Sequence, residues 1–131
     1  MTGLARLPGY EAGAHWRRGF GRWGEELAAG YLQRSGLVLL SRNWSCREGE
    51  LDLVLTDRAR VVFCEVKTRS GTEYGLPSET VTPEKAERVR RAAEQWLRAF
   101  RLGWCRTRYD VVTVLARPGE RPSVRHLEAA F

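Results

Sequence analysis

The sequence predicts a single α/β domain, and three observations support that prediction. Apolar side chains recur at helical spacing in two segments, one near residues 21–35 and one near 82–103. Strand-like segments fill the rest, which gives the order helix, three strands, helix, strand and one closing strand. The chain has 131 residues, of which 43% are hydrophobic, so it can form one core and has little room for a second.

The first helix is expected from about Gly21 to Ser35. Trp23 and Leu27 fall on one helical face, together with Tyr31. Gly36 follows as a residue that readily adopts the left-handed conformation in which helices end. An extended segment over 37–44, dense in apolar side chains, is expected as the first strand.

Two further strands are expected on either side of a polar turn at residues 56–60. The first, Glu50–Leu55, alternates, so that Leu51, Leu53 and Leu55 are expected on one face and Glu50, Asp52 and Val54 on the other. The second, Val61–Lys67, has the strongest strand pattern in the chain. Within it, Glu65 and Lys67 are two residues apart and therefore project from the same face.

A hairpin turn centred between residues 58 and 59 would place Asp52 opposite Glu65. Neighbouring carboxylates repel each other unless a cation lies between them, and hard oxygen ligands suit Mg²⁺ or Mn²⁺. Lys67 could then stabilise charge on a phosphate or orient the attacking water. The alternative is a set of cross-strand ion pairs, Glu65 with an arginine and Lys67 with Asp52. The apolar neighbours imply burial, which makes unpaired carboxylates costly and favours the functional interpretation.

The rest of the chain predicts a loop, a helix and two strands. Residues 70–80 hold two glycines and a proline and are expected to form the loop. Thr82 is expected to cap the second helix, and Gly103 to end it. Strands are expected over 109–116 and, more weakly, over 124–131. Most tryptophans fall on apolar stripes and are expected in the core rather than as base-stacking platforms: Trp23, Trp44, Trp96 and Trp104.

Charge and cysteine content indicate the environment. Lys and Arg number 22 against 16 Asp and Glu, a net charge of +6, which favours a polyanionic partner. Residues 1–18 are expected to form a basic, flexible arm, and 19–131 the domain. Three cysteines without CxxC spacing argue against a disulfide framework or a zinc site and suggest a reducing cytoplasm. No run of eighteen apolar residues predicts a membrane span.

Asp52, the turn and Glu65-Val66-Lys67 resemble the motif of the PD-(D/E)XK nucleases, which include restriction enzymes and archaeal Holliday-junction resolvases. A longer set of residues is similar to the YraN-like family, uncharacterised protein family 0102: Gly24-Glu25, Asn43, Gly49–Val54, Phe63–Arg69, Tyr74-Gly75, Lys85 and Tyr109–Val112. The resemblance runs from about Gly21 to Phe131. It departs from the nuclease motif at Leu51, where a proline usually precedes the aspartate.

This resemblance implies a restriction-endonuclease-like fold, a central mixed sheet flanked by helices with an αβββαβ core. It also implies Mg²⁺ or Mn²⁺ as cofactor, with Glu25, Asp52 and Glu65 as metal ligands. Asp52, Glu65 and Lys67 would be the catalytic residues. Glu25 could instead stabilise the helix dipole, since it lies near the expected helix start. Glu50 shares the face of Asp52 and is a candidate of second rank.

Nucleic-acid contacts are expected from Arg69, Lys85 and Arg88, although surface ion pairs or a solvated helix face would explain the same residues. The expected function is a magnesium-dependent endonuclease, acting on structured or branched DNA more than on RNA, in repair or recombination. By analogy with resolvases it could form a homodimer. The alternatives are a non-catalytic nucleic-acid-binding module of the same fold and a scaffold that docks on another protein.

Overall fold

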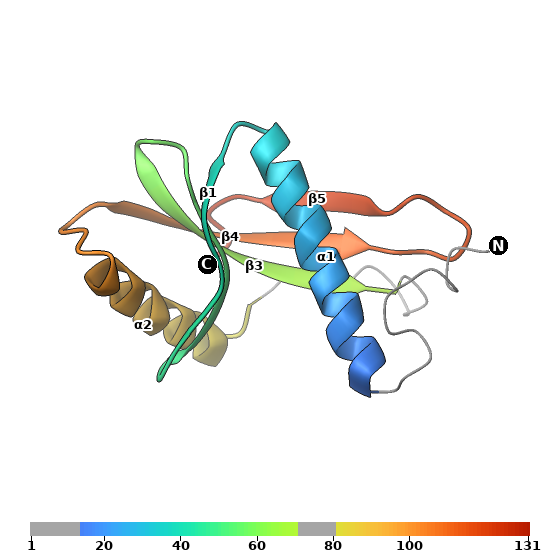
Figure 1. Cartoon of the computed structure of the whole chain (residues 1–131), viewed down its shortest axis with the longest axis horizontal. Helices are drawn as coiled ribbons and strands as arrows, with labels where there is room; N and C mark the ends of the chain where they lie inside the picture. The colour runs from blue at the N-terminus through green and yellow to red at the C-terminus, as the bar shows by residue number, and fades with distance from the viewer. Residues whose placement is uncertain (1–13, 71–80) are drawn as a thin grey trace.

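A computed structural model describes residues 14–70 and 81–131, with side chains from Arg18 onward. Most of the expected arm and the loop over 71–80, with Gly71, Gly75 and Pro77, lie outside the described residues. The elements, shown in Figure 1, are α1 (Ala14–Arg34), β1 (Val38–Cys46), β2 (Gly49–Thr56), β3 (Arg60–Arg69), α2 (Pro83–Ala99), β4 (Arg106–Leu115) and β5 (Ser123–Leu127).

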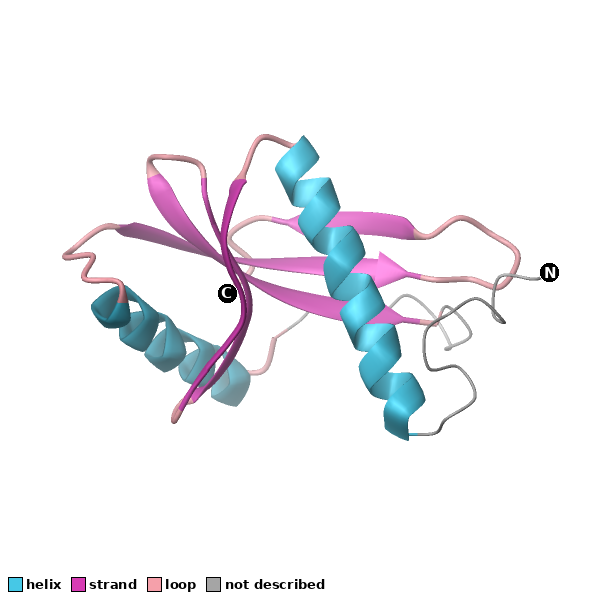
Figure 2. Cartoon of the chain, viewed as in Figure 1, coloured by secondary structure: helices cyan, strands magenta, loops and turns pink. Residues whose placement is uncertain are grey.

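In the described part of the chain, five strands form one mixed sheet in the order β1-β2-β3-β4-β5. The pair β3–β4 is parallel, and the other neighbours are antiparallel. Parallel neighbours require a crossover connection, and α2 lies between β3 and β4 in the chain for that reason. The predicted α/β fold with a restriction-endonuclease-like core is therefore confirmed. In Figure 2, α1 crosses in front of the sheet and α2 lies behind it.

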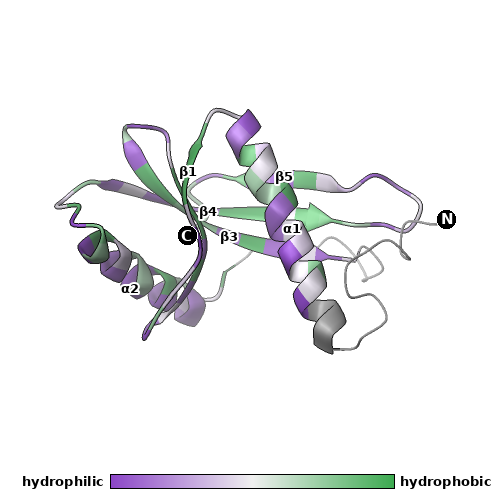
Figure 3. Cartoon of the chain, viewed as in Figure 1, coloured by the Kyte–Doolittle hydropathy of each residue, from purple (hydrophilic) through white to green (hydrophobic). Residues whose placement is uncertain are grey.

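The face of the sheet under α1 is closely packed. Ala28, Ala29 and Leu32 of the helix are fully buried against side chains that alternate along the strands, including Val62 and Cys64. Alanines allow the helix backbone to come close to the sheet. Figure 3 shows apolar residues along β4 where it passes behind this helix.

The opposite face packs against α2. Phe63 meets Trp96 edge to face, with ring centroids 5.9 Å apart. The indole nitrogen of Trp96 donates to the hydroxyl of Ser41 in β1 at 2.9 Å. Thr82 caps the helix as predicted, since its side chain accepts a hydrogen bond of 3.2 Å from the backbone of Lys85. The Trp96 contacts therefore hold the C-terminal part of α2 against β1 and β3, and the Thr82 cap defines where the helix begins.

Leu51, Leu53 and Leu55 were predicted to share one face of the sheet, and this prediction is wrong for Leu51. Leu53 and Leu55 pack under α1, whereas Leu51 packs on the α2 side with Val54. The reason is in the pairing: β2 pairs with β3 only from Leu53 to Thr56 but with β1 along its whole length. On the N-terminal side of Leu53, β2 stays paired with β1 but not with β3. The strand therefore changes orientation there, and Leu51 lies on the other side of the sheet from Leu53.

The ends of the helices also differ in part from expectation. α1 begins at Ala14, before the expected start at Gly21. It ends as predicted, with Gly36 in the left-handed region at φ 102°. α2 ends earlier than Gly103, because Arg101 adopts the left-handed conformation at φ 55°. The closing strand stops at Leu127, short of Phe131.

Neither helix in the described ranges is long and apolar enough to cross a membrane. The three cysteines are free thiols: Cys46, Cys64 and Cys105.

Candidate metal and nucleic-acid site

The predicted hairpin register is confirmed. Leu53 pairs with Cys64, as a turn centred between residues 58 and 59 requires, so Asp52 is the next residue along from the last paired position. There the Asp52 carboxylate accepts a hydrogen bond of 2.9 Å from the backbone of Val66, and its side chain also hydrogen-bonds to that of Glu65. The two carboxyl groups therefore meet where β2 separates from β3.

Two more carboxylates join them. One oxygen each from Glu25, Glu50 and Asp52 lie within 4.8 Å of one another, and Glu65 adjoins this group through Asp52. We call these four residues the acidic cluster. It draws on α1, β2 and β3, elements far apart in the sequence. Glu50, a second-rank candidate from the sequence, lies as close to Asp52 as Glu25 does.

Asn43 is a contributor to the site that the sequence did not single out. Its side chain hydrogen-bonds to Glu25, and its backbone lies in the left-handed region at φ 47°, which asparagine tolerates better than most residues. It thus holds the α1 carboxylate near the β1–β2 hairpin. The available signal was its place among the residues that carry the family resemblance.

The acidic cluster is electrostatically unbalanced. Burial and the nearby charge of Glu65 raise the pKa of Asp52 to about 8, although the hydrogen bond from Val66 acts in the opposite direction. Burial also raises the pKa of Glu25, and Glu50 and Glu65 add to the effect. A divalent cation would remove this repulsion. Carboxylate oxygens are the ligands that Mg²⁺ and Mn²⁺ prefer, so the donor set fits the expected metal.

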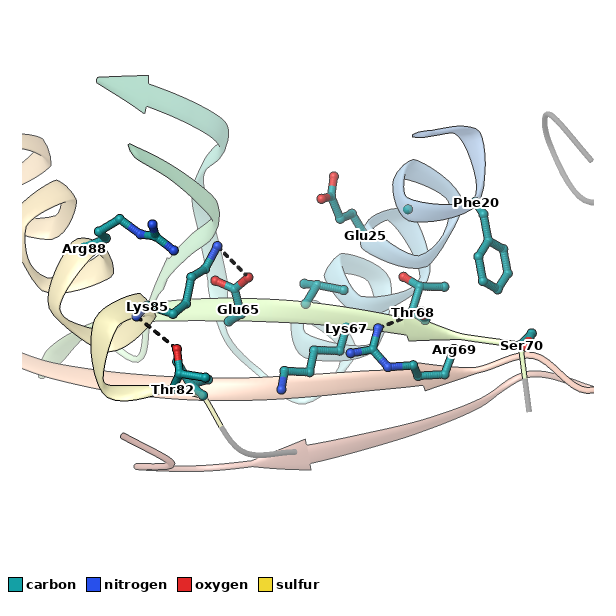
Figure 4. Close-up of a pocket in the computed structure, with 13 residues that line it drawn as sticks. Phe20, Glu25, Glu65, Lys67, Thr68, Arg69, Ser70, Thr82, Lys85 and Arg88 are labelled. Carbon is teal, nitrogen blue, oxygen red and sulfur yellow. Dashed lines mark hydrogen bonds and ion pairs between the residues drawn. The ribbon is translucent and has the colours of Figure 1, made fainter. Parts of the chain in front are cut away.

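A pocket of about 720 Å³ opens beside the acidic cluster. Glu25 and Glu65 belong to both, and Figure 4 shows them on opposite sides of the pocket, from α1 and β3. Among the described residues, the other charged side chains that line it are basic: Lys67, Arg69, Lys85 and Arg88. Every residue predicted to bind nucleic acid therefore lines one pocket, which adjoins the predicted metal ligands.

Lys85 and Arg69 are among the basic residues of the pocket that have acceptors. Lys85 Nζ lies 3.6 Å from Glu65 Oε1, and Arg69 donates to the backbone oxygen of Thr68 at 3.1 Å. Dashed lines mark both contacts in Figure 4. The Glu65 partner is thus a lysine of α2, not the arginine of the cross-strand alternative. Lys85 has a side chain that is 41% exposed, which leaves it accessible from the pocket.

The position of α1 depends on a close approach at Gly24. A Cβ at this residue would collide with the side chain of Thr68 in β3. Glu25, the next residue, reaches the acidic cluster because glycine allows this contact. At Gly21, one turn earlier, an added Cβ would meet no described atom within 4 Å.

Asp110, one of the residues that carry the family resemblance, lies outside the acidic cluster. It pairs with Arg108 of its own strand through two hydrogen bonds of 2.9 and 2.8 Å. The next strand, β5, contributes His126, whose Nε2 lies 2.7 Å from the carboxylate. In a strand, residues two apart share a face, which explains the pairing within β4.

The fold and the acidic cluster define a small α/β protein with a restriction-endonuclease-like core. Residues 24–114 match Uncharacterised protein family UPF0102, and the chain belongs to that family. A UPF0102 protein of Nocardia farcinica is 47% identical over 115 residues, 88% of this chain and 91% of the relative. A relative from Frankia alni is 51% identical over 111 residues, 85% and 92% of the two chains. One from Acidothermus cellulolyticus is 46% identical over 125 residues, 88% and 95%.

Proposed function

We propose that this protein is a Mg²⁺- or Mn²⁺-dependent endonuclease that hydrolyses phosphodiester bonds in nucleic acid, with structured or branched DNA as the expected substrate. The observation that carries the proposal is the contact between the acidic cluster and the basic pocket. Four carboxylates with insufficient positive charge adjoin a cavity whose other charged groups are Lys67, Arg69, Lys85 and Arg88. A metal ion would neutralise the carboxylates, and phosphates would pair with the basic side chains of the pocket.

Glu25, Asp52 and Glu65 would hold the metal, with Glu50 as a further ligand. When bound, such an ion polarises a phosphate oxygen and lowers the pKa of its water. The backbone of Val66 orients the Asp52 carboxylate through the 2.9 Å hydrogen bond. Asn43 orients Glu25 in the same way. Asp52 and Glu25 are therefore positioned by neighbours before any substrate arrives.

The basic residues would position the substrate. Lys67, two residues from Glu65 on the same strand, would stabilise the negative charge that develops on the phosphate under attack. Arg69, Lys85 and Arg88 would hold neighbouring phosphates in the pocket. Lys85 lies close enough to Glu65 to link the metal ligands with the phosphate contacts.

The test is a cleavage screen on labelled branched, flapped, single-stranded and linear DNA, with Mg²⁺ or Mn²⁺ and with EDTA. We expect metal-dependent cutting that falls by about 100-fold or more in Glu65→Gln and Asp52→Asn. Glu26→Gln is the matched control, because Glu26 follows Glu25 in α1 but is exposed and pairs with Arg42. Cutting by Glu65→Gln at the unaltered rate would refute the proposed site.

The second candidate is a nucleic-acid-binding module of the same fold that does not cut. The ion pair between Lys85 and Glu65 favours it, since that pair already neutralises part of the acidic cluster. This candidate predicts binding whose logarithmic affinity falls linearly with the logarithm of salt concentration, without cleavage under any metal.

A further inference from the structure

The turn that follows α2 exposes three large apolar side chains close together in the sequence. Phe100 is 51% exposed, Leu102 42% and Trp104 90%. We call residues 100–104 the aromatic turn. The exposure of Trp104 contradicts its expected place in the core. A tryptophan is large and rarely lies almost wholly in solvent, so an exposed one beside two other apolar side chains indicates a contact surface.

This exposure is fixed by the backbone. The amide of Leu102 donates to the oxygen of Leu97 at 2.9 Å, and that of Arg101 donates to Arg98 at 3.0 Å. With Arg101 in the left-handed region, this is the Schellman arrangement that ends many helices. The Phe100 ring also packs on Trp96, with centroids 4.7 Å apart. The aromatic turn therefore presents its side chains from an ordered helix end.

The charges around the aromatic turn select an anionic partner. Arg98, Arg101 and Arg106 are exposed, and the sequence from 98 to 106 contains no acidic residue. An uncharged protein surface or a cationic one would leave these arginines without partners. Exposed aromatic rings combined with arginines are the features by which proteins hold unpaired nucleotides, because bases stack on the rings and phosphates meet the cations.

The same helix connects the aromatic turn with the pocket. Lys85 and Arg88 line the pocket near the start of α2, and Arg91 and Arg98 lie further along the helix, turned by about 120° to 140° around its axis from Lys85. Arg91 also pairs with Glu87 at 3.3 Å. At a rise of about 1.5 Å per residue, α2 spans roughly 20 Å from Lys85 to its end. A strand that runs from the pocket to the aromatic turn therefore has to cover roughly this length and follow the helix partly around its axis.

We propose that the aromatic turn is a stacking platform for an unpaired base of the nucleic acid held in the pocket, with Trp104 as its principal contact. This inference rests on the nucleic-acid substrate of the proposed function and specifies its class, a strand whose single-stranded segment extends from the pocket to the end of α2. Bases in an intact duplex are already stacked on their neighbours and cannot use the platform.

The experiment measures binding of single-stranded DNA of 12 nucleotides and of a blunt 12-base-pair duplex, both in EDTA so that nothing is cut. We expect Trp104→Ala to weaken binding of the 12-nucleotide strand by about 5- to 150-fold. Trp104→Phe should retain most of the affinity because it keeps an aromatic face. Binding of the duplex, whose bases are already stacked, should change less than about twofold. Leu127→Ala is the control for loss of exposed apolar surface, since Leu127 is 41% exposed on β5.

Equal affinity of Trp104→Ala and the unaltered protein for the 12-nucleotide strand would overturn the inference. So would a change in tryptophan fluorescence with vesicles containing 30% phosphatidylserine but none with the oligonucleotide, since the turn would then be a membrane contact. Binding and cleavage are measured separately. If Trp104→Ala loses strand binding but the unaltered protein cuts no substrate, the nuclease proposal is refuted and the stacking platform stands. If the unaltered protein cuts and Trp104→Ala binds the strand normally, the platform is refuted and the nuclease proposal stands.

Discussion

Two aspartates of the same sheet, one fully buried and one partly buried, have opposite environments. Asp110 in β4 is fully buried and is surrounded by donors, namely Arg108, His126 and the backbone amide of Ala129 at 3.0 Å. Burial raises the pKa of Asp110, but these donors outweigh it and hold the pKa below its usual range. Asp52 in β2 has one backbone donor and the three other members of the acidic cluster as neighbours, and its pKa rises to about 8.

The difference separates a carboxylate that stabilises the fold from one that is held ready for a ligand. A buried charge is costly unless hydrogen bonds and an opposite charge compensate for it. At Asp110 the chain supplies both. At Asp52 it supplies more negative charge instead, in a place where a cavity gives access from solvent. Uncompensated charge of this kind is typical of functional sites. Replacing each aspartate by asparagine should therefore show whether it serves stability or function.

The largest expected effect is on stability. Asp110→Asn should lower the free energy of unfolding by up to about 3–5 kcal/mol, because Arg108, whose side chain is 10% exposed, would keep only the exposed Glu128 as an ion-pair partner. Asp52→Asn should leave stability in EDTA unchanged or raise it, because it removes charge repulsion. Urea denaturation of both variants measures this. Equal losses at the two positions would mean that Asp52 is also a structural residue.

The approach of α1 to β3 should matter next. Gly24→Ala should destabilise the protein by about 1–3 kcal/mol and reduce metal-dependent activity, because the added methyl displaces the helix at Thr68 and Glu25 with it. Gly21→Ala, made in the same helix with open space around it, should show neither loss. If the two variants behave alike in thermal unfolding and in cleavage, the close contact does not position the acidic cluster.

The pH dependence of stability should have opposite signs at the two aspartates. Between pH 4 and pH 8, folded Asp52 keeps a proton that the unfolded chain has released, since its pKa rises from 3.8 to about 8. Its contribution to stability is therefore present below pH 4 and is lost as the pH rises through this window. The contribution of Asp110, whose pKa is lowered, is lost as the pH falls below about 4.

Urea denaturation in EDTA from pH 4 to pH 8 should therefore show a loss of stability that Asp52→Asn abolishes. Saturating Mg²⁺ should offset the same loss at high pH, because the ion favours the charged carboxylates. A slope that is identical in Asp52→Asn would show that other groups are responsible.

The sequence allowed the register of β2 and β3 to be predicted because the turn at Asp57 is short and both strands have strong apolar patterns. It could not show where pairing stops. That depends on the competition between β1 and β3 for β2, and it decides the side on which Leu51 lies. The place of Glu50 in the acidic cluster has the same origin, since Glu50 lies in the part of β2 that does not pair with β3.

Contacts that lie outside any local pattern were also out of reach. Arg108 pairs with Asp110 within the same strand. From the sequence alone, an arginine on a neighbouring strand is an equally good partner for Asp110. Trp104 follows an apolar helix stripe in the sequence, but the left-handed Arg101 ends the helix before that residue and turns it into solvent. A helix end without glycine has no clear sequence signal.

The smallest effect is expected where the acidic cluster does have a basic neighbour. Lys85→Met should change stability by less than about 1 kcal/mol, because the pair with Glu65 is 3.6 Å long and its lysine is 41% exposed. Arg108→Met, which leaves Asp110 buried without its main partner, should cost several times more. Calorimetric titration with Mn²⁺ should show tighter binding to Lys85→Met, because a competing positive charge beside Glu65 is gone, while strand binding weakens. If Lys85→Met instead destabilises the protein as much as Arg108→Met, then Glu65 is balanced by its lysine as fully as Asp110 is by its arginine, and the acidic cluster has no need of a metal.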